Sequence, residues 1–429
     1  MRERKKQTMS LNTALIKYIP LASIKSEQVQ PKKLKAACQN EAKSFDLNNS
    51  PTSLYNRVNF KGLEIKGKET KAVVFTDNLD YKAYRQIQEL CNHPAFRDAN
   101  IRIMPDVHTG KASITGLSAT VDEANGVIPN IIGGDMGCGM LCIKLDIKDD
   151  SIDFEALDEV VKECTSDKHI RTPRQVNVPD SFIKASETLC KKVLKESTDS
   201  CIGRLGTLGG GNHFVEIDKD DAGDYYLLIH SGSRNFGQKI ARHYQEIANQ
   251  QNPYKIKDMS YLTGSELKEY LAAMKIARDY SRINRRIIAD DIMQKMGWKE
   301  VSSFESVHNY ISDDKIMRKG AISAAEGEKV IIPLNMKDGA LIATGKGNSE
   351  WNKTSPHGAG RKFSRSEAGR ILDMNEYAES MEGIYSSCVT PSKIQESPQA
   401  YKDPSEIINN ISDTVEIQGT IKPIYNYKV

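Results

Sequence analysis

The chain has 429 residues, of which 60 are basic and 57 acidic, so its formal net charge is +3. A charge this small excludes a global basic field, and any nucleic-acid site would have to be a local patch. The sequence contains no run of eighteen apolar residues, which excludes a membrane-spanning helix. Its length is sufficient for one large core or for two or three domains.

The first 58 residues differ in composition from the rest of the chain. They are rich in Lys, Gln, Asn and Ser and end near the turn-forming run 48–51. We therefore predict an N-terminal extension of unknown function over 1–58 and a separate folded unit over 59–429. A signal peptide is not expected, because polar residues interrupt the apolar stretch after the basic start. The eight cysteines form no CxxC pair, which is typical of reduced thiols and indicates the cytoplasm.

Two candidate functional segments occur early in the chain. The alternating run 101–108 predicts a strand that ends by presenting Asp106 and His108 to one side. The apolar run 127–132 predicts a short buried strand that leads into the glycine-rich turn 133–140.

The turn carries a carboxylate, Asp135, three residues before a thiol, Cys138. Glycines let neighbouring side chains converge, and a converging carboxylate and thiolate would repel each other unless a cation lay between them. This pattern is consistent with half of a metal site. The segment alone favours a simpler interpretation, namely a tight turn with an ordinary buried cysteine.

Histidines follow at comparable positions further along. Three glycines precede His213, and the buried-strand run 225–229 leads directly to His230. His308 lies in a polar turn, and His357 stands between a proline and two glycines.

The longest predicted helix covers 265–296. Thr263 and Glu266 resemble a capping box at its start. Its arginines are interpreted as a solvated basic face; they are Arg282, Arg285 and Arg286.

A lone histidine at a strand end is more often structural than a metal ligand. Here His213, His230 and His308, together with Asp135 and Cys138, would supply up to five ligands, more than the four of a closed structural zinc site. That number suits a catalytic centre with one or two ions. Thiolate and imidazole favour zinc, whereas the carboxylate widens the choice to manganese or iron, and the residues alone leave the metal open.

Eight motifs, in family order between residues 60 and 429, resemble those of the RtcB family of RNA-splicing ligases. They are DxHxGK (106–111), GxDxGCGM (133–140), GGGNHFxE (209–216), HSGSRxxG (230–237), HN (308–309), PLNMxDGxL (333–341), HGAGRxxSR (357–365) and AYKD (400–403). The extension 1–58 is not covered by the resemblance.

The resemblance implies a single compact α+β catalytic domain with mixed β-sheets, surrounding helices and a central metal and GTP cleft. The alternation of strands and helices is too irregular for a Rossmann or barrel fold. The implied activity joins an RNA 3′-phosphate or 2′,3′-cyclic phosphate to a 5′-hydroxyl, with GTP and two manganese ions, in tRNA splicing or RNA repair. The expected enzyme is a monomer; whether it needs an archease-like activator, and which RNA it joins, stay open.

The resemblance also implies roles for individual residues. His357 is the expected nucleophile, which becomes guanylylated at the α-phosphorus of GTP, and Asp106 is a second catalytic candidate without an assigned role. Cys138 would bridge the two ions, and Arg234 and Arg361 would hold RNA phosphates. The other implied metal ligands are Asp135, His213, His230 and His308. The implied nucleotide contacts are Asn212, His213, Phe214, Val215, Glu216, His308, Asn309, Pro333, Leu334, Asn335, Met336, Gly358, Ala359, Gly360, Tyr401 and Lys428, with Glu216 and Lys428 on the guanine edge.

The sequence departs from the family pattern at Ala112, Gly134, Ala340 and Gln395. None of these changes removes an implied ligand or the nucleophile. Two other interpretations compete with the ligase. A metal-dependent phosphohydrolase or phosphodiesterase could use the same Asp/Cys/His cluster, but would give His357 no specific role. A non-catalytic RNA-binding relative would need neither Cys138 nor His357.

Overall fold

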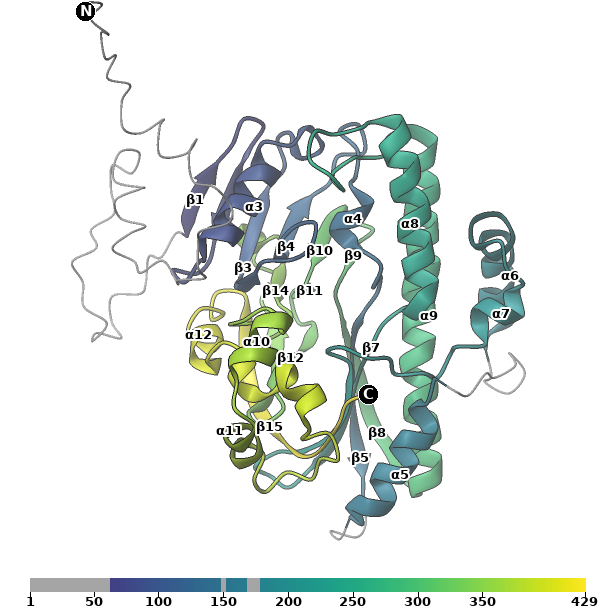
Figure 1. Ribbon diagram of the computed structural model, residues 1–429, viewed down its shortest axis with the longest axis vertical. Coiled ribbons are helices and arrows are strands. Elements are labelled where there is room, and N and C mark those ends of the chain that lie inside the picture. Colours follow the sequence, from purple (N-terminus) through teal and green to yellow (C-terminus); the bar gives the residue numbers. More distant parts are fainter. Residues whose placement is uncertain (1–61, 148–151, 168–177) are drawn as a thin grey trace, which may run out of the picture. The chain divides into compact units, whose positions relative to one another are not determined.

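Three β-sheets with helices packed against them make up the described part of the chain (Figure 1). The computed structural model describes residues 62–147, 152–167 and 178–429, so the predicted extension 1–58 lies outside the described residues. The arrangement confirms the mixed α+β class that the sequence predicts. No helix within the described ranges is both long and apolar enough to cross a membrane.

The first sheet has six strands in the order β1-β2-β3-β4-β10-β9. Only the β2–β3 pair is parallel, and α3 (Tyr81–Cys91) connects these two strands. The strands are β1 (Leu63–Lys66), β2 (Lys71–Val74), β3 (Ile101–His108), β4 (Thr115–Thr120), β10 (Ile316–Lys319) and β9 (Tyr310–Ile311).

The second sheet has seven strands in the order β12-β13-β15-β6-β7-β5-β8, and every neighbouring pair is antiparallel. They are β12 (Lys329–Asn335), β13 (Gly339–Gly345), β15 (Val415–Tyr427), β6 (Phe214–Lys219), β7 (Tyr225–Ser231), β5 (Gly139–Asp146) and β8 (Lys299–Val307). A short third sheet pairs β11 (Ala321–Ser323) with β14 (Thr354–Pro356), directly before His357.

Helices α8 (Arg234–Gln251) and α9 (Gly264–Met296) pack side by side against the sheets (Figure 1). Besides α3, the other helices that the described residues form before β8 are η1 (Pro94–Phe96), α4 (Pro129–Ile132), α5 (Phe154–Thr165), α6 (Asp180–Leu189), η2 (Cys190–Leu194) and α7 (Thr198–Ile202). Those after β13 are η3 (Ser349–Trp351), α10 (Arg365–Ile371), α11 (Met374–Ser380), η4 (Pro391–Glu396), η5 (Pro398–Ala400) and α12 (Pro404–Ile408).

Helix α9 takes part in two hydrophobic cores. Its first half, including Tyr270 and Tyr280, packs in the core beneath the six-stranded sheet. Its last turns, including Ile288 and Ile292, pack against one face of the seven-stranded sheet. The middle of α9 therefore lies where the two cores meet, and this is the part that reaches the candidate site.

Three local predictions were wrong. The run 127–132 is not a strand: Val127 makes one isolated bridge, and Pro129 begins the one-turn helix α4, because a proline suits the first helical position. The capping box at the start of α9 does not form, since the Thr263 side chain caps no backbone N–H and Glu266 instead accepts hydrogen bonds from Ser265 and Gln251.

The third error concerns Arg285. Its side chain is fully buried, whereas those of Arg282 and Arg286 are 74% and 43% exposed. The basic face of α9 is thus solvated only in part.

Candidate functional site

The ends of four neighbouring strands bring the predicted metal ligands together. Strands β6, β7, β5 and β8 are adjacent and antiparallel, so the end of one lies beside the start of the next. Cys138 precedes β5, His213 precedes β6, His230 lies near the end of β7 and His308 follows β8. These residues are far apart in the sequence and meet at one edge of the sheet.

The side chains at this edge crowd around one point. The Sγ atom of Cys138 lies 3.4 Å from Nε2 of His213 and 3.2 Å from Nε2 of His230. Asp135 Oδ2 is 3.3 Å from Nε2 of His213, and Nε2 of His308 is 3.4 Å from Nε2 of His230. All five predicted ligands therefore join one cluster.

The chemistry of this cluster fits a metal ion. The ligand atoms of Cys138, His213 and His230 lie within 4.8 Å of one another, and all three residues are buried. In a metal site with bonds of about 2.0–2.3 Å, neighbouring ligand atoms are separated by about 3.5 Å, close to the distances here. Hydrogen bonds alone do not explain why these side chains lie so close together, because a neutral imidazole has a single N–H and cannot donate to several neighbouring ligand atoms.

Burial favours the neutral, metal-binding form of His230 and of His308. Burial lowers the pKa of His230 and of His308 well below the usual value, so both imidazoles stay neutral. Loss of hydration would raise the pKa of Asp135, but His213, Cys138 and His230 together outweigh it and the net shift is downward. Burial and Asp135 raise the pKa of the Cys138 thiol. A bound cation would reverse this last effect, because metal coordination deprotonates a thiol.

Helix α9 holds the loops that carry these ligands. Arg285 Nη1 donates to Gly137 O at 3.0 Å and to Ser231 O at 2.8 Å, and these carbonyls neighbour Cys138 and His230. Asn284 contributes as well, since its Nδ2 donates to the Ser231 hydroxyl at 3.0 Å. The buried part of α9 is therefore a support for the ligand loops.

Asp106 and His357 form a second functional unit beside the cluster. Asp106 Oδ2 lies 2.6 Å from Nδ1 of His357 and 3.1 Å from its backbone nitrogen, which donates to the same oxygen. Gly360 allows this approach: its φ is 75°, and an added Cβ would lie 2.3 Å from the Asp106 carbonyl oxygen. The ring of His357 is 4.8 Å from that of His308, so the dyad adjoins the metal residues.

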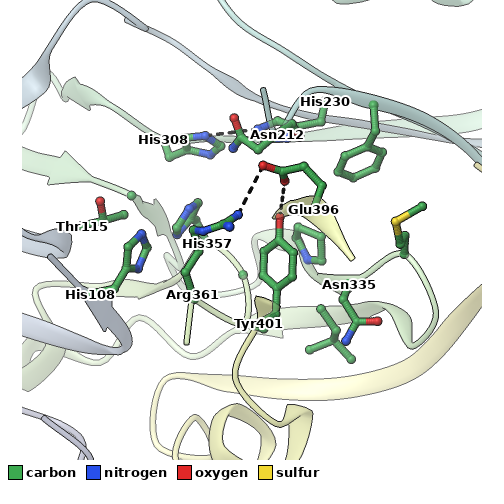
Figure 2. A pocket seen from close by; sticks show the side chains of 18 of the residues that line it. His108, Thr115, Asn212, His230, His308, Asn335, His357, Arg361, Glu396 and Tyr401 are labelled. Atoms are coloured by element: carbon green, nitrogen blue, oxygen red, sulfur yellow. Dashed lines mark hydrogen bonds and ion pairs between the residues drawn. The ribbon is translucent and has the colours of Figure 1, made fainter. Parts of the chain in front are cut away.

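A cavity of about 270 Å³ connects the two units (Figure 2). It is lined by His230, His308 and His357, and its other walls come from β12, the loop after β14, η4 and the C-terminus. The predicted residues that line it are Asn212, Phe214, Glu216, Asn309, Pro333, Leu334, Asn335, Met336, Gly358, Ala359, Gly360, Arg361, Tyr401, Lys428 and Asp135.

One end of the cavity holds a buried acid and a buried amine. Glu216 accepts a hydrogen bond from the Asn426 amide, and burial raises its pKa to about 7. The Lys428 ammonium lies 4.7 Å from the centre of the Phe214 ring, and burial lowers its pKa. An acceptor and a donor are thus available side by side for a planar polar ligand.

Glu396 organises another part of the cavity wall, where Figure 2 shows it beside Arg361 and Tyr401. Its carboxylate accepts from the Tyr401 hydroxyl at 2.6 Å, and it pairs with Arg361 at 3.3 Å and with Arg365 at 3.0 Å. Two arginines therefore share one buried carboxylate at the cavity.

Two predicted residues lie apart from the cavity, from the metal cluster and from the Asp106–His357 pair. Val215 is fully buried and packs in the core on the other face of the sheet, because side chains alternate along β6. Arg234 pairs with Asp167 at 3.3 Å and also donates to Thr207, and it does not line the cavity.

Sequence reasoning missed Lys319, a cation in the cavity wall. Its Nζ donates to Ile132 O at 3.0 Å and lies near Asp135 and Cys138. Because Lys319 ends β10, which pairs with β4 across the first sheet, only the tertiary fold brings it to the site. Thr115 and Glu396 were missed for the same reason.

Sequence comparisons relate this chain to a known protein family. The sequence model of a family described as tRNA-splicing ligase RtcB matches residues 86–202 and 180–429. The chain is 28% identical over 366 residues to the RNA-splicing ligase RtcB of Escherichia coli (strain K12), covering 76% of this chain and 89% of that protein.

Relatives occur in other domains of life. The tRNA-splicing ligase RtcB of Methanococcus maripaludis is 25% identical over 433 residues, with 80% of this chain and 89% of the relative covered. The RNA-splicing ligase RtcB homolog 2 of Entamoeba dispar is 26% identical over 419 residues, covering 76% and 78%.

Proposed function

The chain belongs to the RtcB family of RNA ligases, and we propose that it joins an RNA 3′-phosphate or 2′,3′-cyclic phosphate to a 5′-hydroxyl end with GTP. The observation that carries this proposal is the Asp106–His357 pair, which adjoins both the metal cluster and the cavity that Glu216 and Lys428 line. A site for hydrolysis alone would need only the metal cluster.

His357 is the proposed nucleophile. Asp106 accepts at Nδ1, so the proton of the neutral ring resides there and the lone pair of Nε2 is free. Nε2 attacks the α-phosphorus of GTP and forms a phosphorus–nitrogen bond. The bond between the α-phosphorus and the α–β bridging oxygen breaks, and pyrophosphate leaves with its electron pair. The GMP group then passes to the RNA 3′-phosphate, and the 5′-hydroxyl displaces GMP to form the new phosphodiester.

The metal residues sit beside this reaction centre. Asp135, Cys138, His213, His230 and His308 would hold two manganese ions. When bound, the ions would neutralise phosphate charge and polarise the phosphorus under attack. The protein's own contribution is the fixed position of these ligands. Arg285 and Asn284 of α9 maintain it through hydrogen bonds to the loops that carry the ligands.

Glu216 and Lys428 are proposed to recognise the guanine. An ionised Glu216 accepts hydrogen bonds from the N1–H and exocyclic amine, and Lys428 donates to an acceptor on the base. Tyr401 and the β12 segment 333–336 would contact the remainder of the nucleotide.

RNA phosphates would approach through the arginines. Arg361 and Arg365 line the cavity and share Glu396, so each could turn part of its guanidinium toward a phosphate without losing its carboxylate contact. A role for Arg234 would require an exchange of Asp167 for phosphate. Cleaved tRNA and other broken RNAs present the same ends.

The test is transfer of label from α-labelled GTP to the chain in the presence of manganese. We expect acid-labile label that survives denaturing electrophoresis in the wild-type protein and disappears in His357→Ala. His243→Ala is the matched control, because His243 lies on α8 and does not line the cavity; it should be labelled normally.

The competing phosphodiesterase predicts a different pattern. In that case neither the wild-type protein nor His243→Ala would carry GMP, although both would hold metal and cleave phosphodiesters. Absence of label from folded, metal-loaded protein, even with an archease-like activator present, would contradict the ligase mechanism.

A further inference from the structure

Asp106 orients a second imidazole besides that of His357. Its backbone carbonyl oxygen lies 2.9 Å from Nδ1 of His108, whereas its carboxylate holds Nδ1 of His357. His108 ends β3 and lines the nucleotide cavity, and the proposed ligase chemistry gives it no role. One residue therefore positions two histidines of the same cavity, each through its Nδ1 atom.

The contact with the carbonyl fixes the tautomer of His108. A carbonyl oxygen only accepts hydrogen bonds, so the proton of the neutral ring resides on Nδ1 and Nε2 carries a lone pair. Nε2 makes no hydrogen bond within the described part of the chain. Loss of hydration lowers the pKa of His108 to about 4, so the ring is neutral at pH 7. An unprotonated imidazole nitrogen is thus available at the cavity.

Lys402 holds the backbone on which both contacts depend. Its Nζ donates to Pro105 O at 3.1 Å and to Val107 O at 2.9 Å, and these two carbonyls flank Asp106. The lysine side chain is buried, so the hydrogen bonds of its ammonium are shielded from water. The end of β3 is therefore held in place where it presents the two imidazoles.

His108 lies in the same part of the cavity wall as His357. Thr115 pairs with His108 across β3 and β4. A Cβ atom added to Gly320 would touch Cγ2 of Thr115 and lie 3.2 Å from Cε1 of His357, so these two side chains are neighbours. His108, Thr115 and His357 all line the cavity, and in the view of Figure 2 His357 lies between His108 and Asn335.

The last step of the proposed reaction needs a proton acceptor. A 5′-hydroxyl attacks phosphorus efficiently only when a base removes its proton. The attacking oxygen must lie in line with the departing GMP, so the base belongs on the side of the RNA phosphate that faces away from GMP. His357 faces the phosphorus of the GMP group itself and is on the wrong side for this task. His108 is a second neutral imidazole in the cavity wall.

We propose that His108 is the general base of the sealing step, an inference that rests on the proposed ligase function. Nε2 of His108 takes the proton of the RNA 5′-hydroxyl while the hydroxyl oxygen forms a bond to the phosphorus of the activated RNA 3′-phosphate. The bond between this phosphorus and the oxygen that bridges to GMP breaks, and GMP leaves with the electron pair. The imidazolium then returns its proton to water.

The charges of the bound substrates favour this proton transfer. Phosphate anions of RNA and nucleotide would raise the pKa of His108 from its low value toward the range in which an imidazole is an effective base near pH 7. The imidazolium would keep its hydrogen bond from Nδ1 to the Asp106 carbonyl, because both ring nitrogens are then donors.

Single-turnover sealing of a preactivated RNA tests the proposal separately from guanylylation. The substrate carries GMP joined through a pyrophosphate to its 3′ end and a free 5′-hydroxyl, so it bypasses the attack of His357 on GTP. In His108→Asn, Nδ2 can replace Nδ1 as the donor to the Asp106 carbonyl, while Nε2 is missing. We expect sealing by this variant to be at least about 100-fold slower, the usual loss of a general base. Labelling of its His357 from GTP should stay close to that of the wild type, which also shows that the variant folds.

Added imidazole and a control variant distinguish a proton acceptor from a structural residue. Free imidazole should restore part of the sealing rate of His108→Ala, because it can enter the space of the missing ring and accept the proton. His243→Ala, on α8 and away from the cavity, should seal at the wild-type rate with or without imidazole.

Two outcomes would overturn the proposal. One is sealing of preactivated RNA by His108→Asn at the wild-type rate. The other is an equal loss of labelling and sealing in that variant, which would assign His108 a structural role alone. Absence of label on wild-type His357 would instead contradict the proposed function, and the sealing of preactivated RNA would still test His108.

Discussion

Asp106 accepts two hydrogen bonds from His357 with a single carboxylate oxygen, one from the ring and one from the backbone. This double contact sets both the position and the tautomer of the histidine. An aspartate at this point has no other evident task, since its second oxygen is buried without a hydrogen-bond partner among the described residues.

Asp106→Asn should therefore reduce guanylylation far more than metal binding. The asparagine carries no negative charge, so it fixes the ring proton at Nδ1 less firmly and does not stabilise the positive charge that the ring gains during attack; loss of the aspartate charge in a catalytic triad lowers the rate about 10⁴-fold. The rate of label transfer from GTP measures the loss, and bound manganese provides the control. An equal loss of metal and of label would instead indicate a folding defect.

Arg285 and Arg282 offer a matched test of the support beneath the metal loops. Both pair with Glu305, but Arg285 is fully buried and also holds Gly137 and Ser231, whereas Arg282 is 74% exposed. Arg285→Ala leaves two buried carbonyls without their charged donor and should cost about 3 kcal/mol. Arg282→Ala should cost less than about 1 kcal/mol.

Urea denaturation of the metal-free variants measures these costs, and manganese titration measures the effect on the site. We expect weaker metal binding in Arg285→Ala alone. Equal destabilisation by the two substitutions would show that the arginines act only through Glu305.

The sequence predicted which side chains meet at the candidate site better than it predicted the local structure around them. His213, His230 and His308 could be identified because histidines after predicted strands or in glycine-rich loops are unusual in such number, and the family motifs assigned them together. The partners from the first sheet could not, since Lys319 has no local pattern and reaches the cavity only through the β4–β10 pairing.

Errors in the fold have a similar cause. Arg285 occupies a helix face that is basic in sequence, yet carbonyls from Gly137 and Ser231 approach it in the fold and make its burial favourable. The run 127–132 has the composition of a strand, but Pro129 lacks the N–H that a strand ladder needs and begins a helix instead.

Cys138 should be essential for metal binding. Its sulfur is the atom that contacts both His213 and His230, so Cys138→Ala removes the thiol at the centre of the cluster and leaves the imidazoles without a thiolate ligand beside them. We expect manganese affinity to fall at least about 100-fold, the upper range for loss of a supporting residue at a metal site. Electron paramagnetic resonance of free manganese gives the affinity, and Cys142→Ala, four residues further along, is the control. Unchanged affinity would exclude Cys138 as a ligand.

Binding of GTP should strengthen as the pH rises through about 7, because burial raises the pKa of Glu216 to about 7. Below that pH the carboxyl keeps its proton and cannot accept both guanine hydrogens, so affinity should fall about tenfold for each further pH unit. Above it the ionised form predominates and affinity levels off. Glu216→Gln should bind more weakly at pH 8 and lose this dependence, whereas titration of the GTP phosphates affects both proteins equally. Fluorescence titration with a GTP analogue between pH 6 and 8, at saturating manganese, measures the difference. Identical pH profiles for the two proteins would mean that Glu216 does not read the base.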